Sequence, residues 1–355
     1  MKVLYDYQAF DMQRVGGISR YFSILHNKLP EYGVNTNLAL FNSENLYIST
    51  DNVRKYLAFL RRKNRRLSKL MIRYSLYDVL HPTYYNPYVL KRKRKHSALV
   101  ITVHDMIHEL YSSQFPDAEE VKENKLKVCK AADRLIAISE NTKRDIMDIW
   151  GIEENRIDVV HHGQMWEDDL QEIAVELPFT GDYLLYVGDR LAEYKNFRNF
   201  AIGVAPGLKK YGLHLVCTGR DFSKSEMELL HQLGIADITV SRTVTDGVLL
   251  WLYRHAACFI YPSYYEGFGI PILEAFQAGC PMLLNHASCF PEIAADAAAY
   301  FEDALPESLY ESLCALLDDS ERRKQLCIKG KERLKLFSTH NMLERTKLAY
   351  ERTMG

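Results

Sequence analysis

The sequence lacks the features that mark a membrane-spanning or metal-clamping protein. No apolar stretch in its 355 residues approaches the ~20 residues that a helix needs to cross a bilayer. The first residues, MKVLYDYQAF, read as a strand interrupted by polar residues and not as a signal peptide. No D-x-D pair of carboxylates is present, so we expect no metal site. We therefore expect a cytoplasmic protein.

The cysteine pattern points to neither a zinc site nor a disulfide framework. The seven cysteines are scattered and form no C-x-x-C pair, which excludes the common zinc-binding and redox motifs. Several lie in apolar runs such as LHLVCTG and AACFIYPS, so we expect reduced, buried thiols. The formal net charge is only -1, and we expect neither a bound cofactor nor a nucleic-acid partner.

Short apolar runs rich in β-branched and aromatic residues alternate with segments of helical period along the whole chain. Their continuous hydrophobicity is typical of parallel strands that crossover helices cover on both faces. The stretch from Gln164 to Asp182 breaks this rhythm, is acidic and contains Pro and Gly, so it reads as a linker. Because the chain is longer than one core supports, the pattern predicts an α/β protein with two doubly wound, Rossmann-like domains facing an interdomain cleft.

Polar residues follow several predicted strands at their carboxyl ends, where ligands bind in folds of this class. Core packing alone does not place polar groups there so regularly. These residues are His104 with Asp105, Ser139 with Glu140, Gly188 to Arg190, Gly219 with Arg220, and Ser263 to Glu266.

The stretch YPSYYEGFGIPILEAFQAGCPML, residues 261–283, combines two glutamates with a Gly-Phe-Gly turn. Pro271 suits the first turn of a helix, so we expect a helix to begin near Ile270. Its first N–H groups lack intrahelical partners, which makes the turn a suitable seat for phosphate oxygens. Glu274 can accept hydrogen bonds from a ribose diol, while Glu266 contacts the other end of the same ligand. The alternative is that Glu274 only compensates the helix dipole and Glu266 is a solvated loop residue.

Two cations, Arg190 and Lys195, lie five residues apart after a predicted strand and a glycine turn. Cations so placed can converge on one anion. Together with the N–H groups of the Gly-Phe-Gly turn they are enough to hold a diphosphate without a metal ion. Taken alone the pair is a weak signal, because Arg and Lys are usually solvated.

The C-terminal half of the chain strongly resembles the GT4 family of retaining glycosyltransferases, which have the GT-B fold. The resemblance rests on the R-x4-K-N pattern at Arg190, the E-x7-E spacing of Glu266 and Glu274, and the segment SCFPEIAADAAAYF, all in the expected order. The N-terminal half matches less densely but in order, through GGISRYF, ITVHDM, AADRLIAISENTKRDI and IDVVHHG. Together the matching segments cover most of the chain.

The resemblance implies a domain plan for the chain. Residues 1–170 form the N-terminal domain on the acceptor side, and residues 171–335 form the C-terminal domain on the side of the nucleotide-sugar donor. Residues 336–355 form a C-terminal helix that crosses back to the N-terminal domain.

The resemblance also implies a role for each matching residue. Arg190 and Lys195 neutralise the donor diphosphate. Glu266 contacts the hydroxyls of the donor sugar and His104 lies near the transferred sugar, which completes the four predicted catalytic residues. The predicted donor-binding residues are Glu274 at the ribose, Val244 beside the base, and Gly16, Gly17, Gly188, Phe268, Gly269 and Ile270 around the phosphates and the sugar.

The implied function is the transfer of a hexosyl residue from a UDP- or GDP-linked sugar to a saccharide acceptor, in the assembly of surface polysaccharide or glycoconjugates. Negative charge grows on the diphosphate as the bond to the anomeric carbon breaks. Fixed cations and a helix N-terminus therefore stabilise the transition state more than the ground state. Two alternatives stay open: a sugar-nucleotide epimerase of the same fold and a non-catalytic saccharide-binding protein.

Residues 54–73 carry nine Lys or Arg and no acidic residue. The apolar residues at helical spacing among these cations are Leu57, Leu60, Leu67 and Met71. Such a helix suits an anionic membrane surface. Packing against the protein core requires the same apolar stripe, so a solvated helix is an equal alternative. Membrane binding would make the protein peripheral on the inner face of the membrane and would favour a lipid-linked saccharide acceptor.

Overall fold

The computed structural model describes residues 1–48, 63–91 and 93–354, so the part of the basic segment before Lys63 lies outside the described residues. Within the described ranges, no helix combines the length and apolarity needed to span a bilayer. None of the seven cysteines, all of which are described, forms a disulfide.

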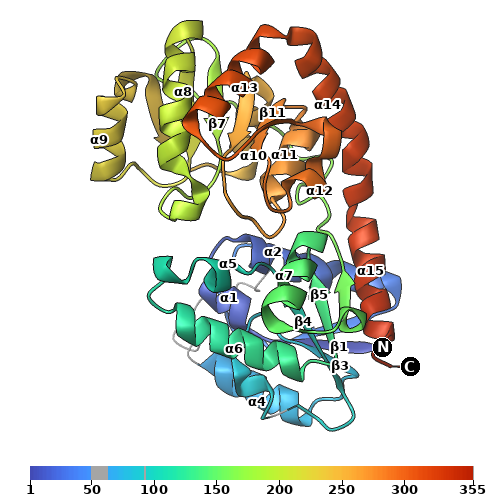
Figure 1. Ribbon diagram of the computed structural model, residues 1–355. Helices are drawn as coiled ribbons and strands as arrows, with labels where there is room; N and C mark the ends of the chain where they lie inside the picture. The colour runs from blue at the N-terminus through green and yellow to red at the C-terminus, as the bar shows by residue number, and fades with distance from the viewer. Residues whose placement is uncertain (49–62, 92, 355) are drawn as a thin grey trace. The chain divides into compact units, whose positions relative to one another are not determined.

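The chain divides into two compact units. Unit 1 comprises Met1–Gly163 and Thr339–Gly355, and unit 2 comprises Gln164–Ser338. The final helix of the chain therefore belongs to the same unit as the first strand. Each unit is built on a six-stranded sheet whose described ladders are all parallel (Figure 1). The predicted α/β class with two Rossmann-like units is confirmed.

The sheet of unit 1 has the strand order β2-β1-β3-β4-β5-β6. The order reverses at β1, which pairs with both β2 and β3. The strands are β1 (Lys2–Tyr5), β2 (Asn35–Leu38), β3 (Val79–His81), β4 (Ala98–Val103), β5 (Arg134–Ala137) and β6 (Ile157–Val159). The helices of this unit are α1 (Gln8–Met12), α2 (Gly17–Lys28), α4 (Asn64–Tyr74), α5 (Ile107–Leu110), α6 (Ala118–Ala131), α7 (Glu140–Trp150) and α15 (Thr339–Glu351), with the 3-10 turns η1 (Leu29–Tyr32), η3 (Pro87–Val89), η4 (Ser112–Gln114) and η5 (Glu154–Arg156).

Helix α15 completes the core of unit 1 from the far end of the sequence (Figure 1). Met342, Leu343 and Tyr350 are buried in the same apolar cluster as the strand residues of β1. The hydroxyl of Tyr350 lies 2.7 Å from Nδ1 of His81 and 3.0 Å from the hydroxyl of Tyr5. Buried polar groups need such partners, so this contact ties the C-terminal helix to β1 and β3.

The sheet of unit 2 has the order β12-β11-β10-β7-β8-β9, and here the order reverses between β7 and β10. The strands are β7 (Tyr183–Tyr186), β8 (His214–Thr218), β9 (Thr239–Arg242), β10 (Cys258–Tyr261), β11 (Met282–Asn285) and β12 (Ala299–Phe301). The helices are α8 (Phe197–Tyr211), α9 (Lys224–Gln232), α10 (Asp246–His255), α11 (Ile270–Ala278), α12 (Phe290–Ala294), α13 (Pro306–Asp318) and α14 (Ser320–Leu334), with the 3-10 turns η6 (Glu193–Lys195), η7 (Ala236–Ile238), η8 (Ala295–Ala297) and η9 (Lys335–Phe337).

Helices cover both faces of the sheet in unit 2. Residues of α8, α9 and α13 share one buried cluster with alternate residues of β7, β8 and β10. On the other face α10 meets the sheet, where the rings of Tyr253 and Phe259 lie 5.2 Å apart at nearly right angles. A sheet buried on both faces explains why its strands read as continuous apolar runs.

Candidate functional site

The candidate site of unit 2 lies where the strand order reverses, since its two main loops follow β7 and β10. Ligands of doubly wound sheets bind at the carboxyl ends of the strands at this switch point. The loop after β7 carries Lys195 and the loop after β10 carries Glu266. The backbone N–H of Tyr264 donates to the carbonyl of Tyr194 over 2.8 Å, so the two loops are joined directly.

Lys195 and Glu266 form an ion pair with 2.6 Å between Nζ and Oε1. Their side chains are 16% and 11% exposed, so solvent screens this pair less than a surface pair. The hydroxyl of Ser263 also donates to Oε1 of Glu266, over 2.8 Å. One carboxylate therefore orients the ammonium group from one side while the other side can receive an anion.

Asn196 fixes the start of α8 directly after Lys195. It has a left-handed backbone, with φ of 57°, and its amide donates to the carbonyls of Pro262 and Ala304 over 3.2 Å and 3.4 Å. Asn tolerates this conformation better than most residues because its short polar side chain bonds to nearby backbone. The K-N pair of the sequence motif is thus a cation followed by the residue that anchors its loop.

The Glu266 loop is also held by the last residue of β11 and by residues that follow this strand. The hydroxyl of Ser288 donates to the carbonyl of Glu266 over 2.7 Å and lies 3.2 Å from its backbone nitrogen. The thiol of Cys289 donates to the same carbonyl over 3.2 Å, and the amide of Asn285 donates to the carbonyl of Ser263 over 3.0 Å. These contacts preorganise the position of the carboxylate.

Helix α11 begins at Ile270, as predicted, after Gly269 with a left-handed φ of 85°. A Cβ at Gly269 would lie 3.1 Å from the side chain of Ile272 and 3.2 Å from that of Phe290, so both its conformation and its surroundings require glycine. No side-chain cap covers this start among the described residues. The first N–H groups and the positive end of the dipole are therefore suited to an anion. The ring of Phe268 packs on Phe337, with ring centroids 5.8 Å apart, so only its backbone can face a ligand.

Glu274 lies one turn into α11, and its Oε2 accepts a hydrogen bond from the hydroxyl of Tyr253 over 3.3 Å. Burial, and then the charge of Glu274, raise the pKa of Tyr253 well above its usual value, so the tyrosine stays a neutral donor. Val244 is half-buried between β9 and α10, and Gly188 follows β7 with φ of 128°. Gly188 and Val244 belong to loops at the carboxyl side of the sheet, and Glu274 lies in the helix that begins there.

Arg190 is placed differently from Lys195, because its side chain is 0% exposed. The guanidinium donates to the carbonyl of Thr218 over 2.9 Å, to the carbonyl of Arg220, and to Oε1 of Glu226 over 3.0 Å. It also stacks over the ring of Phe222 at 4.6 Å. The structure does not bring the two predicted cations to a common partner.

Glu226 is the centre of this second cluster, and sequence reasoning missed it. It completes a capping box at the start of α9 with Ser223, and its Oε2 lies 3.2 Å from the guanidinium of Arg220. Burial alone raises the pKa of Glu226, but hydrogen bonds from Ser223 and the charges of Arg190 and Arg220 lower it overall. The S-x-x-E pattern at 223–226 is the signal that could have identified it.

The remaining predicted residues, Gly16, Gly17 and His104, belong to unit 1. Gly16 precedes α2 in an extended conformation, and a Cβ there would lie 2.3 Å from the side chain of Gln13. His104 follows β4, is 7% exposed, and donates its backbone N–H to the hydroxyl of Tyr85 over 3.1 Å. Its buried Nε2 has no hydrogen-bond partner in the described part of the chain.

The imidazole of His104 is neutral at physiological pH. Burial, and then the positive charge of Lys125, lower its pKa to about 3. Lys125, which sequence reasoning missed, is fully buried on α6 and pairs with Glu109 over 2.9 Å. A neutral imidazole with an unsatisfied nitrogen can donate or accept a hydrogen bond but does not supply charge.

Three sets of comparisons bear on this site. Residues 15–163 match the family model described as Glycosyltransferase Family 4, and residues 168–333 match that of Glycosyl transferases group 1. The chain is 26% identical over 201 residues to an O-antigen chain mannosyltransferase, RfbU, of Salmonella typhimurium, covering 56% of this chain and 55% of the relative. It is 30% identical over 174 residues to O-antigen chain mannosyltransferase B of Escherichia coli, covering 48% of this chain and 45% of the relative.

The chain thus spans about half the length of these curated relatives. Among solved structures it is similar to Anabaena HepE in complex with UDP and glucose. The TM-score is 0.70 at 12% identity, with 98% of each chain covered, which is a likeness of fold.

Proposed function

Because this chain belongs to the family 4 glycosyltransferases of the GT-B fold, we propose that it transfers a hexosyl residue from a nucleoside-diphosphate sugar to a saccharide acceptor. The observation that carries the proposal is the Lys195–Glu266 pair beside the uncapped start of α11, at the switch point of the sheet. UDP and GDP are the candidate nucleotides. The names of the relatives make a mannosyl residue the first sugar to test, and a surface polysaccharide the first acceptor class.

The proposed reaction follows from the leaving group. An oxygen of the acceptor bonds to the anomeric carbon while the bond from that carbon to the diphosphate breaks, with retention of configuration. The electron pair leaves with the diphosphate, and the proton of the acceptor hydroxyl passes to a diphosphate oxygen. Lys195 and the N–H groups at Gly269 and Ile270 stabilise this growing charge, which is the largest single contribution in many such sites.

The other residues bind and orient the donor in this proposal. Glu266 accepts hydrogen bonds from the sugar hydroxyls, Glu274 accepts them from the ribose, and Val244 borders the base. His104 offers its neutral Nε2 to the transferred sugar, and the backbone at Gly16, Gly17 and Gly188 approaches the phosphates. Arg190, since it is buried and fully engaged, holds the loops after β7 and β8 in place and acts on the diphosphate only through them.

A ligand-binding experiment tests the donor assignment. Thermal unfolding is followed with UDP, GDP and ADP, because a ligand at 100 times its dissociation constant stabilises the folded state by ~2.7 kcal/mol. We expect UDP or GDP to raise the midpoint and ADP to have little effect. A midpoint that none of the nucleotides moves would contradict the proposal.

Turnover experiments separate the alternatives. We expect NMR of the reaction mixture to show hexosyl transfer that needs an acceptor and persists in EDTA, since Lys195 and the helix start supply the positive charge. An epimerase would instead convert the donor sugar without an acceptor. A non-catalytic binding protein would bind a nucleotide or saccharide and leave the donor intact.

Helix α4 supports a membrane-bound, lipid-linked acceptor as part of the proposal. The helix packs on unit 1 through Asn64, Ser68 and Ile72, which are fully buried, whereas Leu70 and Tyr74 are 56% and 70% exposed. Of the predicted stripe, Leu57 and Leu60 lie outside the described residues, and Leu67 and Met71 are half-buried. Apolar side chains on the exposed face among cations suit an anionic bilayer.

Flotation with phosphatidylglycerol vesicles tests this part. We expect the wild type to float and a Leu70→Asp/Tyr74→Asp variant to stay at the bottom of the gradient. A Leu305→Asp variant, which changes an exposed leucine of unit 2, is the matched control. Flotation of all three proteins, or of none, would remove the membrane from the proposal.

A further inference from the structure

Lys125 is a buried cation to which the proposed reaction gives no role. It belongs to α6 in unit 1, and its side chain is 1% exposed. A lysine is rarely buried to this degree unless it is paired, because taking an ammonium group out of water costs free energy. The partners of Lys125 therefore show what this charge holds in place.

The oxygen partners of Lys125 belong to one short stretch, residues 105–109. Nζ donates to the carbonyl of Asp105 over 2.5 Å and to Oε2 of Glu109 over 2.9 Å. Oδ1 of Asp105 lies 3.8 Å from the same nitrogen. Asp105 directly follows His104, so one ammonium group holds both ends of the stretch that begins beside the predicted catalytic histidine.

The stretch that Lys125 holds has little apolar packing of its own. It contains α5, a single turn whose apolar residues Ile107 and Leu110 are half-buried and exposed, respectively. A helix this short is not stable without tertiary contacts. Met106, just before the turn, is buried and anchors one point. The ammonium group supplies the contact that ties Glu109, within the turn, to α6.

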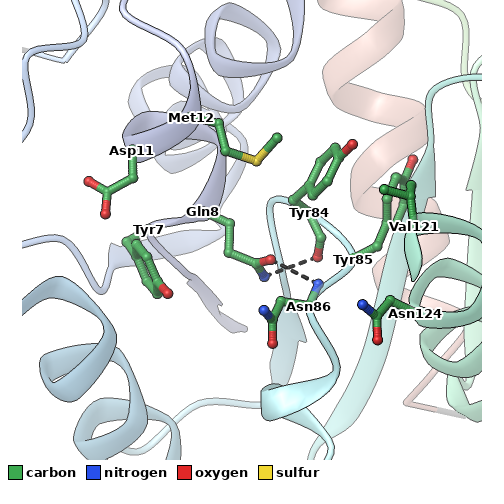
Figure 2. Close-up of a pocket in the computed structure, with 9 residues that line it drawn as sticks. All are labelled: Tyr7, Gln8, Asp11, Met12, Tyr84, Tyr85, Asn86, Val121 and Asn124. Atoms are coloured by element: carbon green, nitrogen blue, oxygen red, sulfur yellow. Dashed lines mark hydrogen bonds between the residues drawn. The ribbon is translucent and has the colours of Figure 1, made fainter. Parts of the chain in front are cut away.

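Tyr85 provides a second connection between Lys125 and His104. Nζ of Lys125 lies 5.4 Å from the centroid of the Tyr85 ring, within the range of a cation–π contact. The hydroxyl of Tyr85 accepts the backbone N–H of His104 over 3.1 Å. Tyr85 also borders a pocket of about 270 Å³ that opens between α6 and the segments after β1 and β3 (Figure 2). Packing around Tyr85 is therefore incomplete, and the cation helps to fix the ring.

The Lys125–Glu109 pair contributes geometry more than stability. Oε1 of Glu109 is buried and has no hydrogen-bond partner within the described part of the chain, so the carboxylate is not fully compensated. Apolar residues of similar volume often stabilise a fold as well as a buried ion pair does. Hydrogen bonds, in contrast, fix the distance and the angle between two groups. This matters at a catalytic group, because a misplacement of about 1 Å can cost about a hundredfold in rate.

We propose that Lys125 is a positioning residue. It fixes the loop after β4 so that His104 meets the transferred sugar, and it does not touch the substrate itself. It acts through the carbonyl of Asp105, the carboxylate of Glu109 and the ring of Tyr85. This assignment rests on the proposed glycosyltransferase function, in which His104 lies near the transferred sugar.

Steady-state kinetics of three variants test the proposal, each measured well below its unfolding midpoint. Lys125→Met removes the cation, Lys125→Met/Glu109→Leu replaces the whole pair by apolar residues, and Glu109→Gln keeps an oxygen acceptor without the negative charge. We expect kcat to fall about 10- to 100-fold in the first two variants. The KM for the nucleotide sugar should be nearly unchanged, because the described contacts of Lys125 include none of the residues assigned to the nucleotide.

Stability and turnover should not follow each other in these variants. The doubly apolar variant should unfold at a higher midpoint than Lys125→Met, since it leaves no buried charge unpaired, yet it should not recover kcat. Glu109→Gln should unfold at a lower midpoint than the wild type but keep most of its kcat, because its amide oxygen can still accept from Lys125. Wild-type kcat in the doubly apolar variant would overturn the proposal. A loss of kcat in Glu109→Gln as large as in Lys125→Met would also overturn it.

Lys143→Met is the matched control. Lys143 lies on α7 of unit 1 and forms a lysine–glutamate pair of 2.7 Å, but its partner Glu154 belongs to η5 and not to the loop after β4. We expect Lys143→Met to have the kcat of the wild type. A loss as large as that of Lys125→Met would show that the effect is not specific to the His104 loop and would overturn the proposal.

NMR of the histidine side chains separates this proposal from the proposed function. Comparison with His104→Gln identifies the Cε1–H resonance of His104. We expect a single sharp resonance in the wild type and in Lys143→Met, and a broadened or split one in Lys125→Met/Glu109→Leu. A single sharp resonance in the doubly apolar variant would overturn the positioning role. If the resonance broadens as expected but the wild type transfers no hexosyl residue, the proposed function fails and the positioning of the histidine stands.

Discussion

The two switch points of the molecule, one in each sheet, are built from different chemistry. In unit 2 the loops after β7 and β10 carry the Lys195–Glu266 pair, and an uncapped helix start lies beside it. In unit 1 the segments after β1 and β3, including helix α1, carry tyrosines and amides and one carboxylate, Asp11, among the residues that line the pocket there. The same topology therefore places an ion pair at the switch point of one unit and mainly uncharged side chains at that of the other.

The difference shows what the topology does and does not decide. A parallel sheet provides an opening between two loops wherever its strand order reverses. The side chains on those loops then determine whether charge or shape is recognised. A sugar nucleotide needs positive charge around its diphosphate, whereas an uncharged saccharide is recognised by shape and hydrogen bonds.

Within unit 2 the comparison extends to the two cations, Arg190 and Lys195. Of the substitutions in this unit, Arg190→Ala should lower the free energy of unfolding most. Arg190→Ala leaves the carboxylate of Glu226 and two backbone carbonyls without their buried donor. Breaking a buried ion pair in this way costs ~3–5 kcal/mol. Urea unfolding should show this loss, whereas Lys195→Ala should unfold close to the wild type. An Arg190→Ala protein of normal stability and no activity would reverse the roles given to these residues.

Lys195→Ala should give the largest effect on turnover. The ammonium group is partly exposed and is positioned by Glu266, whose carboxylate accepts a hydrogen bond from Ser263, so its loss removes charge stabilisation from the leaving diphosphate. Removing one such group lowers kcat by ~10²–10³-fold, or ~2.7–4 kcal/mol. Steady-state rates at saturating donor and acceptor measure this, with Lys209→Ala on the far end of α8 as the control lysine. A loss of less than tenfold would refute the role of Lys195.

The histidines of unit 1 predict that the free energy of unfolding depends on pH between pH 6.5 and 3. Burial lowers the pKa of His81, His104 and His162 from 6.5 to about 3. Between pH 6.5 and 3 the unfolded chain binds protons that the folded chain does not, so the free energy of unfolding falls as pH decreases and is constant above pH 6.5. At pH 5 each such imidazole lowers the free energy of unfolding by about 2 kcal/mol relative to its value above pH 6.5.

Urea unfolding at pH 7.5 and pH 5 measures this loss, with His104→Gln as the comparison. The charged and titratable groups around these imidazoles are Tyr5, Tyr21, Tyr85, Lys125, His161 and Tyr350. Asp6, whose pKa burial raises, acts in the opposite direction, so the difference between the proteins isolates the histidine. We expect a shallower pH dependence in His104→Gln; an identical one would mean that His104 is protonated in the folded state.

Gly269→Ala should lower the stability of unit 2, by less than Arg190→Ala does. The substitution forces a side chain into a left-handed conformation and against Ile272 and Phe290, at a cost of ~1–3 kcal/mol. We expect a lower unfolding midpoint and weaker nucleotide binding, since the helix start shifts. Gly279→Ala, at the other end of α11 with φ of 74° and 3.5 Å to its nearest neighbour, should lower the midpoint without changing nucleotide binding. Equal nucleotide binding in both variants would show that the turn does not hold the phosphates.

Much of the unit 2 site could be predicted because its residues are close in sequence. Glu266, Gly269 and Glu274 lie on one turn and the helix that follows it, so their spacing carried the prediction of a helix beginning at Ile270. Arg190 shows the limit of this reasoning. The R-x4-K-N pattern placed it in the right loop, but sequence spacing does not reveal that its guanidinium turns inward to Glu226, which is 36 residues away.

The pocket of unit 1 that Tyr7, Gln8 and Tyr84 line could not be predicted from the sequence. Gln8 and the residues after β3 that it contacts are 76 or more positions apart in the chain. Tyr7, Tyr84 and Asn124 form no motif, and each alone reads as an ordinary core or surface residue. The buried Lys125 and the polar buried face of α4 were missed for the same reason.

By itself the sequence determined the α/β class, the alternation of parallel strands with crossover helices, and the glycine and proline that begin α11, because each depends on residues within one short segment. Only the tertiary structure decided which cation faces outward, which face of α4 is buried and where a pocket opens between β1 and β3. These depend on contacts between segments distant in the chain, and the free energy of such contacts is set by packing and burial rather than by local spacing.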